Sequence, residues 1–309
     1  MRLAFFGTSE FAVPALHALA GSAHEVGLVV AAPAQPSGRG RKLVPSPVEQ
    51  EARALDLGVL TPADPNDPAF IAELKSRNPD AAVLAAYGYI LKPALLAAPR
   101  LGFLNIHPSL LPRYRGAAPI QRALLAGESK TGVTLILLSE QVDAGDVIEQ
   151  ESLSIGRDET AGELSQRLAE TGARLVLSAL AGMETGTATR TQQDPKLATR
   201  APKIAKSERS IDWRDSAQGI HNRIRALSPE PGAVTAFREN RIVLLRSRIH
   251  STSDQGQPGE LLVDRAGLVV AAGSGTIEVI ELKPEGKRTQ SGRDFRNGHR
   301  PLAGERFAA

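Results

Sequence analysis

Short apolar runs alternate with amphipathic segments along the N-terminal half of the chain. The apolar runs are bounded by Gly, Asp or Pro, which predicts strands at Met1–Phe6, Glu25–Ala32, Ala81–Ala86 and Gly102–Asn105. The segments between them predict helices at Ser9–Ala20, Val48–Leu57 and Pro68–Arg77. This alternation is typical of parallel βαβ units, so we expect an α/β fold with a Rossmann-like, open and mostly parallel sheet. Ligands of such sheets gather beyond the carboxyl ends of the strands.

The pattern changes in the second half of the chain. Further strands are predicted at Gly132–Leu138 and Val147–Ser152, and a long helix at Glu159–Leu180. From Gly186 to Arg209 the apolar periodicity is lost and Thr, Pro, Lys and Arg increase, which is a linker composition. A short helix near Ser216–Ala226 is followed by strand-like runs at Ala233–Phe237, Ile242–Leu245, Glu260–Val263, Leu268–Ala272 and Thr276–Leu282. We therefore expect a first domain over residues 1–189, a linker over 190–206 and a smaller β-barrel domain over 207–309.

The composition restricts the chemistry that the chain can perform. It contains no cysteine, which excludes disulfides, thiolate nucleophiles and cysteine-ligated metal sites and fits a reducing cytoplasm. No apolar run approaches the roughly 18 residues of a membrane-spanning helix, and the histidines lack paired metal-ligand spacing. Lys and Arg number 37 against 34 Asp and Glu, with the excess in the C-terminal third, which permits a polyanionic partner without requiring one. We expect a cytoplasmic protein that uses no metal and no membrane.

The segment with the most chemical potential is NIHPSLLPRYRGAAPIQ, Asn105–Gln121, directly after a predicted strand. Asn105, His107 and Ser109 alternate with apolar residues, so an extended backbone directs these polar side chains to one side. Asparagine can donate to a developing oxyanion, and histidine can transfer a proton or stabilise negative charge. The alternative is structural, with His107 satisfying a strand end and Asn105 a turn.

A second segment, VDAGDVI at Val142–Ile148, places two carboxylates in a turn between predicted strands. Asp143 and Asp146 can each serve as a turn-forming residue. Beside His107, one of them would favour the protonated imidazole, and such a pair can stabilise an oxyanion or relay a proton. The sequence spacing leaves both roles open.

Taken together, these motifs resemble the folate-dependent formyltransferases and, within them, the enzymes that act on methionyl-tRNA. The resemblance rests on HPSLLPRYRGAAPIQ and VDAGD, and it extends to FFGTSEFAVPAL at Phe5–Leu16, SGRGRKLVPSPV at Ser37–Val48, AAYGYIL at Ala85–Leu91 and IDW at Ile211–Trp213. It covers most of the chain in collinear order. The chain departs from the family at Gln141, where glycine is usual, and at residues 32–35, where TQPD is common.

The resemblance implies transfer of the formyl group of 10-formyltetrahydrofolate to the α-amino group of methionyl initiator tRNA, for translation initiation. By matching motifs, it implies that Asn105 and His107 stabilise the oxyanion, while Asp143 supports protonated His107 and helps to relay a proton. The residues that it places around the folate are Ser109, Leu110, Leu111, Pro112, Tyr87, Ile90, Leu91 and Val142.

The resemblance also implies how RNA is bound. A basic loop, GRGRK at Gly38–Lys42, would contact the acceptor end of tRNA through Arg39, with Arg41 and Lys42 as phosphate partners. The C-terminal domain resembles an OB-like β-barrel and is expected to add a basic surface that includes Lys203 and Lys206. The sequence leaves the oligomeric state open, and we expect a monomer.

Two other functions explain part of the sequence. A sugar-nucleotide N-formyltransferase would keep the folate donor and the Asn105, His107 and Asp143 trio, but the GRGRKL loop and the AAPIQ segment argue against it. A non-catalytic RNA-binding protein would explain the basic C-terminal third but not the trio. Hydrolase and nucleotide-triphosphatase functions are disfavoured, because no GxSxG, complete Walker A or complete GxGxxG motif occurs.

Overall fold

The computed structural model describes residues 1–37, 42–253, 256–263 and 266–308. The predicted RNA contacts Arg39 and Arg41 lie outside the described residues, and Lys42 is described by its backbone alone. The chain divides into two compact units. The N-terminal unit comprises Met1–Gly116, Thr131–Leu153 and Ser165–Arg200, and the C-terminal unit comprises Ala117–Lys130, Ser154–Leu164 and Ala201–Ala309.

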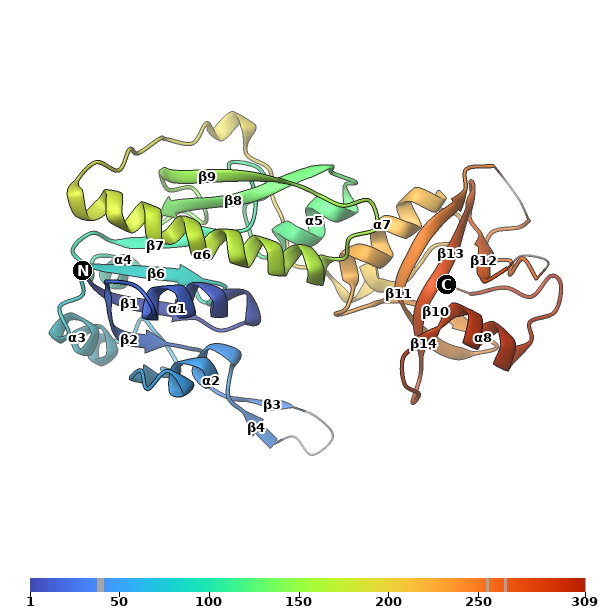
Figure 1. Ribbon diagram of the computed structural model, residues 1–309, viewed down its shortest axis with the longest axis horizontal. Coiled ribbons are helices and arrows are strands. Elements are labelled where there is room, and N and C mark those ends of the chain that lie inside the picture. Colours follow the sequence, from blue (N-terminus) through green and yellow to red (C-terminus); the bar gives the residue numbers. More distant parts are fainter. Residues whose placement is uncertain (38–41, 254–255, 264–265, 309) are drawn as a thin grey trace. The chain divides into compact units, whose positions relative to one another are not determined.

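The N-terminal unit is built on a seven-stranded sheet (Figure 1). In spatial order its strands are β5 (Val59–Leu60), β2 (Glu25–Val30), β1 (Arg2–Gly7), β6 (Ala81–Ala85), β7 (Phe103–His107), β8 (Lys130–Leu137) and β9 (Val147–Ser154). The neighbouring strands from β5 to β7 are parallel, whereas β8 runs antiparallel to β7. The predicted Rossmann-like, mostly parallel sheet is thus confirmed.

Caps and prolines account for where the helices of this unit begin. Before α2 (Pro47–Ala54), the Ser46 hydroxyl accepts a hydrogen bond from the Glu49 N–H, and before α3 (Pro68–Ser76) the Asp67 carboxylate accepts one from the Ala69 N–H. Proline suits the first helical position because the N–H that it lacks would have no partner there. The helix predicted from Ser9 begins as a 3-10 turn. The remaining helical elements are η1 (Glu10–Ala12), α1 (Val13–Ala20), α4 (Pro93–Leu96) and α6 (Ala161–Thr185).

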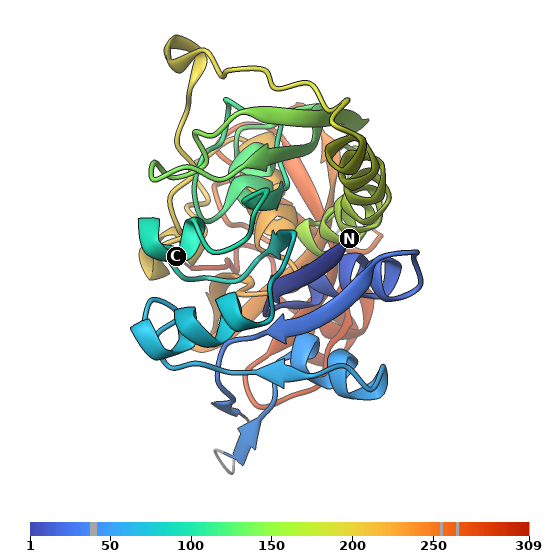
Figure 2. The same cartoon turned by 90° about the vertical axis from the view of Figure 1, so that its left-hand side faces the viewer.

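Helices cover both faces of the sheet, and Figure 2 shows α6 and α3 on opposite sides of the strands. Phe70 of α3 packs in one apolar cluster with Phe103 of β7. On the other face, a Cβ at Gly172 of α6 would lie 2.5 Å from the Ile106 side chain. Side chains alternate along a strand, so the polar residues at positions 105 and 107 share the face of Phe103.

The strand order reverses between β1 and β6. From β1 the chain builds outwards through β2 and β5, and it then adds β6 and β7 on the other side of β1. Open α/β sheets bind ligands at such a reversal, beyond the carboxyl ends of the strands. Gly7 ends β1 at this point, where a Cβ would lie 2.8 Å from the Ala12 Cβ and 3.1 Å from the Ala85 carbonyl oxygen. Glycine therefore permits the close approach of the segments at the end of β1.

The C-terminal unit contains a curled, antiparallel five-stranded sheet. Its spatial order is β10 (Ala233–Phe237), β11 (Asn240–Ser251), β13 (Thr276–Pro284) and β12 (Leu268–Ala271), with β14 (Gln290–Ser291) beside β13. Its helices are α5 (Pro119–Leu125), α7 (Ala217–Leu227) and α8 (Gly292–His299). In the core, Trp213 stacks on Phe307 and donates its indole N–H to the Thr235 hydroxyl at 3.0 Å. The predicted fold class, an α/β domain followed by a smaller OB-like β domain, is confirmed.

Several details differ from the sequence predictions. The strand predicted at Glu260–Val263 is wrong, because this segment forms isolated bridges only, and Gly259 before it turns the backbone with a φ of 83°. The stretch of linker composition, Gly186–Arg209, contains two 3-10 turns, η2 (Pro195–Leu197) and η3 (Lys206–Arg209). A hairpin of β3 (Gln35–Ser37) and β4 (Lys42–Val44) was not predicted. Among the described residues, no helix combines the length and apolar character needed to cross a membrane.

Candidate active site

Three polar residues meet at the end of β7. Asn105 and His107 lie on β7, and Asp143 lies in the loop between β8 and β9. The Asn105 amide donates a long hydrogen bond of 3.5 Å to Asp143 Oδ1, and His107 Nδ1 lies 3.7 Å from Asp143 Oδ2. The Gly116 N–H donates to the same Oδ2 at 2.9 Å. The structure therefore brings the predicted trio together and adds a backbone donor that the sequence did not indicate.

The buried ring of His107 has different neighbours at its two nitrogens. Nε2 lies 3.0 Å from the carbonyl oxygen of Tyr114. A carbonyl can only accept, so Nε2 carries the hydrogen of this bond. Burial lowers the pKa of His107, while the Asp143 carboxylate and the Tyr114 carbonyl offset part of this effect. The resting ring is therefore neutral near pH 7, and a protonated His107 arises only when Nδ1 takes up a proton.

The loop that carries Asp143 has a constrained backbone. Asp143 has a φ of 51°, in the left-handed region, which typically costs a residue other than glycine about 1–3 kcal/mol. Two residues later, a Cβ at Gly145 would lie 1.6 Å from the carbonyl oxygen of Leu137, so only glycine fits. The left-handed turn at Asp143 and the close approach at Gly145 fold the loop back against the end of β8.

The predicted folate-binding turn, Ser109–Pro112, is anchored from within. Ser109 is fully buried, and its hydroxyl donates to the Arg113 carbonyl at 2.7 Å. The Thr134 hydroxyl donates to the Ser109 carbonyl at 2.6 Å and accepts from the Leu111 N–H at 3.1 Å. The Ser109 hydroxyl and the Leu111 backbone N–H thus hold the turn, and the Leu111 side chain is buried, whereas Leu110 and Pro112 are only half-buried.

The other predicted folate contacts divide into core and surface residues. Tyr87 and Leu91 lie in the apolar cluster of the N-terminal unit. Burial raises the pKa of the Tyr87 hydroxyl, which has no hydrogen-bond partner among the described residues. Ile90 and Val142, in contrast, are 74% and 60% exposed. The Asn66 side chain fixes the loop around Ile90, because it donates to the Ile90 carbonyl at 3.1 Å and accepts from the Lys92 N–H at 2.7 Å.

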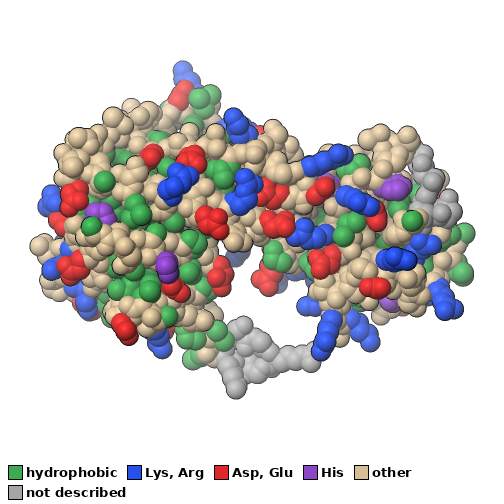
Figure 3. Space-filling model, viewed as in Figure 1, with side chains coloured by type: hydrophobic (Ala, Val, Ile, Leu, Met, Phe, Trp, Pro, Cys, Tyr) green, Lys and Arg blue, Asp and Glu red, His purple; other side chains and the backbone are tan. Residues whose placement is uncertain are grey.

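Lys203 and Lys206 are exposed in the C-terminal unit. Figure 3 shows basic side chains scattered over the visible face of this unit with acidic ones between them. On the β3–β4 hairpin, Leu43 and Val44 are exposed. Lys203 and Lys206, the predicted RNA contacts whose side chains the structure describes, are therefore accessible to solvent.

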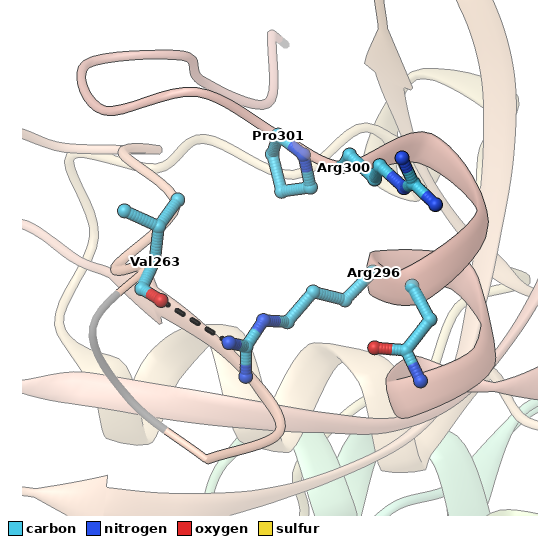
Figure 4. A pocket seen from close by; sticks show the side chains of 5 residues that line it. Val263, Arg296, Arg300 and Pro301 are labelled. Carbon is cyan, nitrogen blue, oxygen red and sulfur yellow. Dashed lines mark hydrogen bonds between the residues drawn. The ribbon is translucent and has the colours of Figure 1, made fainter.

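A cavity of about 410 Å³ lies at the end of α8 (Figure 4). Neither Asn105, His107 nor Asp143 is among its lining residues. Its walls are Val263, Arg296, Asn297, Arg300 and Pro301. The Arg296 guanidinium donates to the carbonyls of Gly267 and Val263 at 3.1 Å and 3.2 Å. Among the described residues, the lining contains two arginines and no acidic residue, a charge that suits an anion. In the part of the chain that the structure describes, no cluster of three His, Cys, Asp or Glu residues could hold a metal.

Comparison with known proteins identifies similar chains over the whole length. The formyl transferase family model matches residues 1–180, and the model for the formyl transferase C-terminal domain matches residues 203–300. A methionyl-tRNA formyltransferase of Carboxydothermus hydrogenoformans is 45% identical over 309 residues, covering 99% of both chains.

Two solved structures share the fold. An N-formyltransferase from Helicobacter canadensis, in complex with folinic acid and dTDP-3-aminofucose, superposes with a TM-score of 0.68 at 17% identity, covering 90% of this chain and 98% of that one. HypX from Aquifex aeolicus in complex with tetrahydrofolic acid superposes with a TM-score of 0.65 at 18% identity, covering 100% of this chain and 50% of that one. At these identities the likeness shows the fold alone.

Proposed function

The chain belongs to the methionyl-tRNA formyltransferase family, and from this membership we infer that it transfers a formyl group from a folate donor to the α-amino group of methionyl initiator tRNA. The observation that carries this function is the meeting of Asn105, His107 and Asp143 at the carboxyl end of β7. We propose 10-formyltetrahydrofolate as the donor and translation initiation as the process served. Because charged tRNA is a cytoplasmic substrate, we place the reaction in the cytoplasm.

We propose distinct roles for the three side chains. The donor supplies the formyl carbon that the amine of methionine attacks, and the Asn105 amide donates a hydrogen bond to the formyl oxygen as it becomes negative. In place of the oxyanion role that the resemblance implies for His107, we propose that its neutral ring takes the proton of the amine at Nδ1, and the Asp143 carboxylate stabilises the resulting imidazolium. The proton then passes from Nδ1 to the departing folate nitrogen, which restores the neutral ring. The 3.7 Å separation leaves Nδ1 without a short bond to break before it acts.

We propose that the folate lies against the apolar side chains of Ile90 and Val142, which are exposed without a ligand. The Tyr87 hydroxyl has no hydrogen-bond partner among the described residues, which supports a polar ligand atom nearby, because a buried hydroxyl normally has a partner. Leu110 and Pro112 would add to this wall, while Ser109, Leu111 and Leu91 hold its shape from behind. Such a mixture of apolar surface and few polar groups is typical of small-molecule sites.

We propose that residues 1–189 carry the chemistry and residues 207–309 contribute RNA contacts, joined by 190–206, in a monomeric enzyme. The phosphate contacts would be Arg39, Arg41 and Lys42 of the loop, with Lys203 and Lys206 beyond it. The two arginines of the cavity in Figure 4 suit an additional phosphate.

Joint replacement of Arg39, Arg41 and Lys42 by Ala should weaken tRNA binding. It should also reduce the slope of the logarithm of the tRNA binding constant against the logarithm of the salt concentration by about 2–3. Lys75→Ala, on the surface of α3, is the control and should leave both unchanged.

The function is tested by supplying the purified protein with 10-formyltetrahydrofolate and three acceptors: methionyl initiator tRNA, free methionine and a nucleotide-linked amino sugar. The proposal expects formylation of the charged tRNA alone. Transfer to the sugar alone would replace the substrate while keeping the chemistry. Binding of tRNA without transfer to any acceptor would instead favour a non-catalytic RNA-binding protein.

A further inference from the structure

Gln193 is a buried amide within a stretch whose composition is that of an exposed linker. It lies between α6 and η2, and its neighbours Gln192 and Asp194 are exposed, whereas Gln193 itself is 7% exposed. A buried amide must find partners for two donor hydrogens and an acceptor oxygen. The partners of Gln193 therefore indicate why this position turns inward.

All polar atoms of the Gln193 side chain are used. Nε2 donates to the carbonyl of Asp143 at 2.9 Å and to that of Gly145 at 2.7 Å. Oε1 accepts from Nε and Nη2 of Arg115, at 3.1 Å and 2.7 Å. One side chain thus links the Asp143 loop to the segment that follows the Ser109–Pro112 turn.

Both linked segments touch the trio directly. The segment next to Arg115 supplies the Tyr114 carbonyl to His107 Nε2 and the Gly116 N–H to the Asp143 carboxylate. The other segment carries Asp143 itself, in its left-handed conformation. Gln193 therefore fixes the distance between the two sides of the site.

The rest of the segment is attached in the same region. The backbones of Thr191 and Val147 exchange two hydrogen bonds, of 2.8 Å and 2.9 Å. Further along, the Thr199 hydroxyl accepts from the Tyr114 N–H at 2.8 Å. Residues 191–199 are thus hydrogen-bonded both to the segment that holds Asp143 and Val147 and to the segment that holds Tyr114 and Arg115, and Gln193 is the buried residue between these contacts.

We propose that Gln193 is a positioning residue for formyl transfer, which holds the Asp143 carboxylate and the Tyr114–Gly116 segment in register around His107. It acts through backbone contacts and touches no reacting atom. This inference rests on the proposed function, since it assigns Gln193 a part in that reaction.

The test compares Gln193→Ala, Gln193→Glu and Gln192→Ala in single-turnover and steady-state formylation of methionyl initiator tRNA. Misplacement of a reacting group by about 1 Å can cost on the order of 10²-fold in rate, so we expect Gln193→Ala to lower kcat by about 10- to 100-fold with KM for both substrates little changed. Gln193→Glu keeps an acceptor for Arg115 but loses both donated bonds, so it should be equally slow. Gln192→Ala, one position away and exposed, should match the parent protein.

A pH profile separates positioning from a general loss of folding. The Asp143 carboxylate raises the pKa of His107, so its displacement should move the acid limb of the kcat profile to lower pH in both Gln193 variants. Variants that are folded by circular dichroism and retain the parental rate and acid limb would overturn the proposal. A normal rate in Gln193→Glu alone would also overturn it, because contact with Arg115 would then suffice. An inactive parent protein would instead contradict the proposed function.

Discussion

Each unit of the molecule buries a histidine beside an aspartate, and the two rings share several features. His107 lies in the N-terminal unit and His221 in α7 of the C-terminal unit, and they are 4% and 1% exposed. Burial lowers the pKa of both. Each Nε2 also lies near a backbone carbonyl, at 3.0 Å from Tyr114 and 3.1 Å from Arg157.

The two sites differ at the second ring nitrogen. His221 Nδ1 lies 3.0 Å from the Ser247 hydroxyl, so both nitrogens of this ring have hydrogen-bond partners. His107 Nδ1 has no partner at that distance among the described residues and faces Asp143 at 3.7 Å. The acidic neighbour of His221, Asp158, is 53% exposed, so water screens its charge. Burial beside a carboxylate is thus common to both rings, whereas an open Nδ1 distinguishes His107, the ring for which we propose the catalytic role.

Replacing the aspartate beside each histidine should separate the two sites most strongly. Asp143→Ala should lower the single-turnover rate by about 10²–10⁴-fold, because protonated His107 loses the charge that stabilises it. Asp158→Ala should leave the rate unchanged. Rapid-quench measurement of formyl-methionyl-tRNA gives both values, and equal rates in the two variants would exclude Asp143 from the reaction.

An asparagine lies near each histidine and provides a second contrast. Asn105→Ala should lower kcat by about 10²–10³-fold, or roughly 2.7–4 kcal/mol, the usual cost of one lost oxyanion donor. Asn222 instead accepts from the side chains of Gln218 and Arg225, both at 3.0 Å, and its replacement by Ala should leave kcat per folded molecule unchanged. A change in KM alone for Asn105→Ala would contradict its oxyanion role.

The residues around His221 should contribute to the free energy of unfolding, although we expect none of them to affect the reaction rate. His221→Ala leaves the Ser247 hydroxyl and the Arg157 carbonyl without their ring partner, which should lower the free energy of unfolding by about 1–3 kcal/mol. Ser247→Ala, which removes one of these bonds, should cost about 0.5–1.5 kcal/mol. Urea unfolding followed by circular dichroism measures both. An unchanged midpoint and slope for His221→Ala would show that its bonds add no net stability.

The smallest expected effect is a change in pH dependence. The pKa of His221 is lowered in the folded protein. As pH falls below the ordinary pKa of about 6.5, this residue therefore binds a proton in the unfolded chain before it does so in the folded protein. The stability from this residue is complete above pH 6.5 and is lost as pH falls through the folded pKa. His221→Gln should reduce the slope of unfolding free energy below pH 6.5, by at most about 1.4 kcal/mol per pH unit. Urea titrations between pH 5 and 7.5 would reveal an unchanged slope if the prediction is wrong.

The sequence predicted the sheet well because periodicity is a local signal. The strands around Phe6, Val30 and Val83 are fully buried on both faces, and such strands read as continuous apolar runs. The segment at Glu260–Val263 reads the same way, but a glycine turn and isolated bridges replace a ladder there. Local pattern therefore indicates a buried strand without showing whether a partner strand exists.

The sequence predicted the three polar side chains of the site but not the backbone groups and the distant residue that contact them. Asn105 and His107 follow from alternation after a strand, and Asp143 from its place between two strands. The Tyr114 carbonyl and the Gly116 N–H carry no side-chain signal, because every residue has these groups. Gln193 lies 50 positions from Asp143 in a stretch without periodicity, so only the folded chain reveals their contact.

The most direct test of the comparison is the single-turnover formylation of methionyl initiator tRNA by His107→Ala and His221→Ala, measured side by side at saturating 10-formyltetrahydrofolate. The account predicts a loss of about 10²–10⁴-fold for His107→Ala and the parental rate, per folded molecule, for His221→Ala. Near-parental turnover by His107→Ala would contradict the assignment of His107 as the group that exchanges the proton.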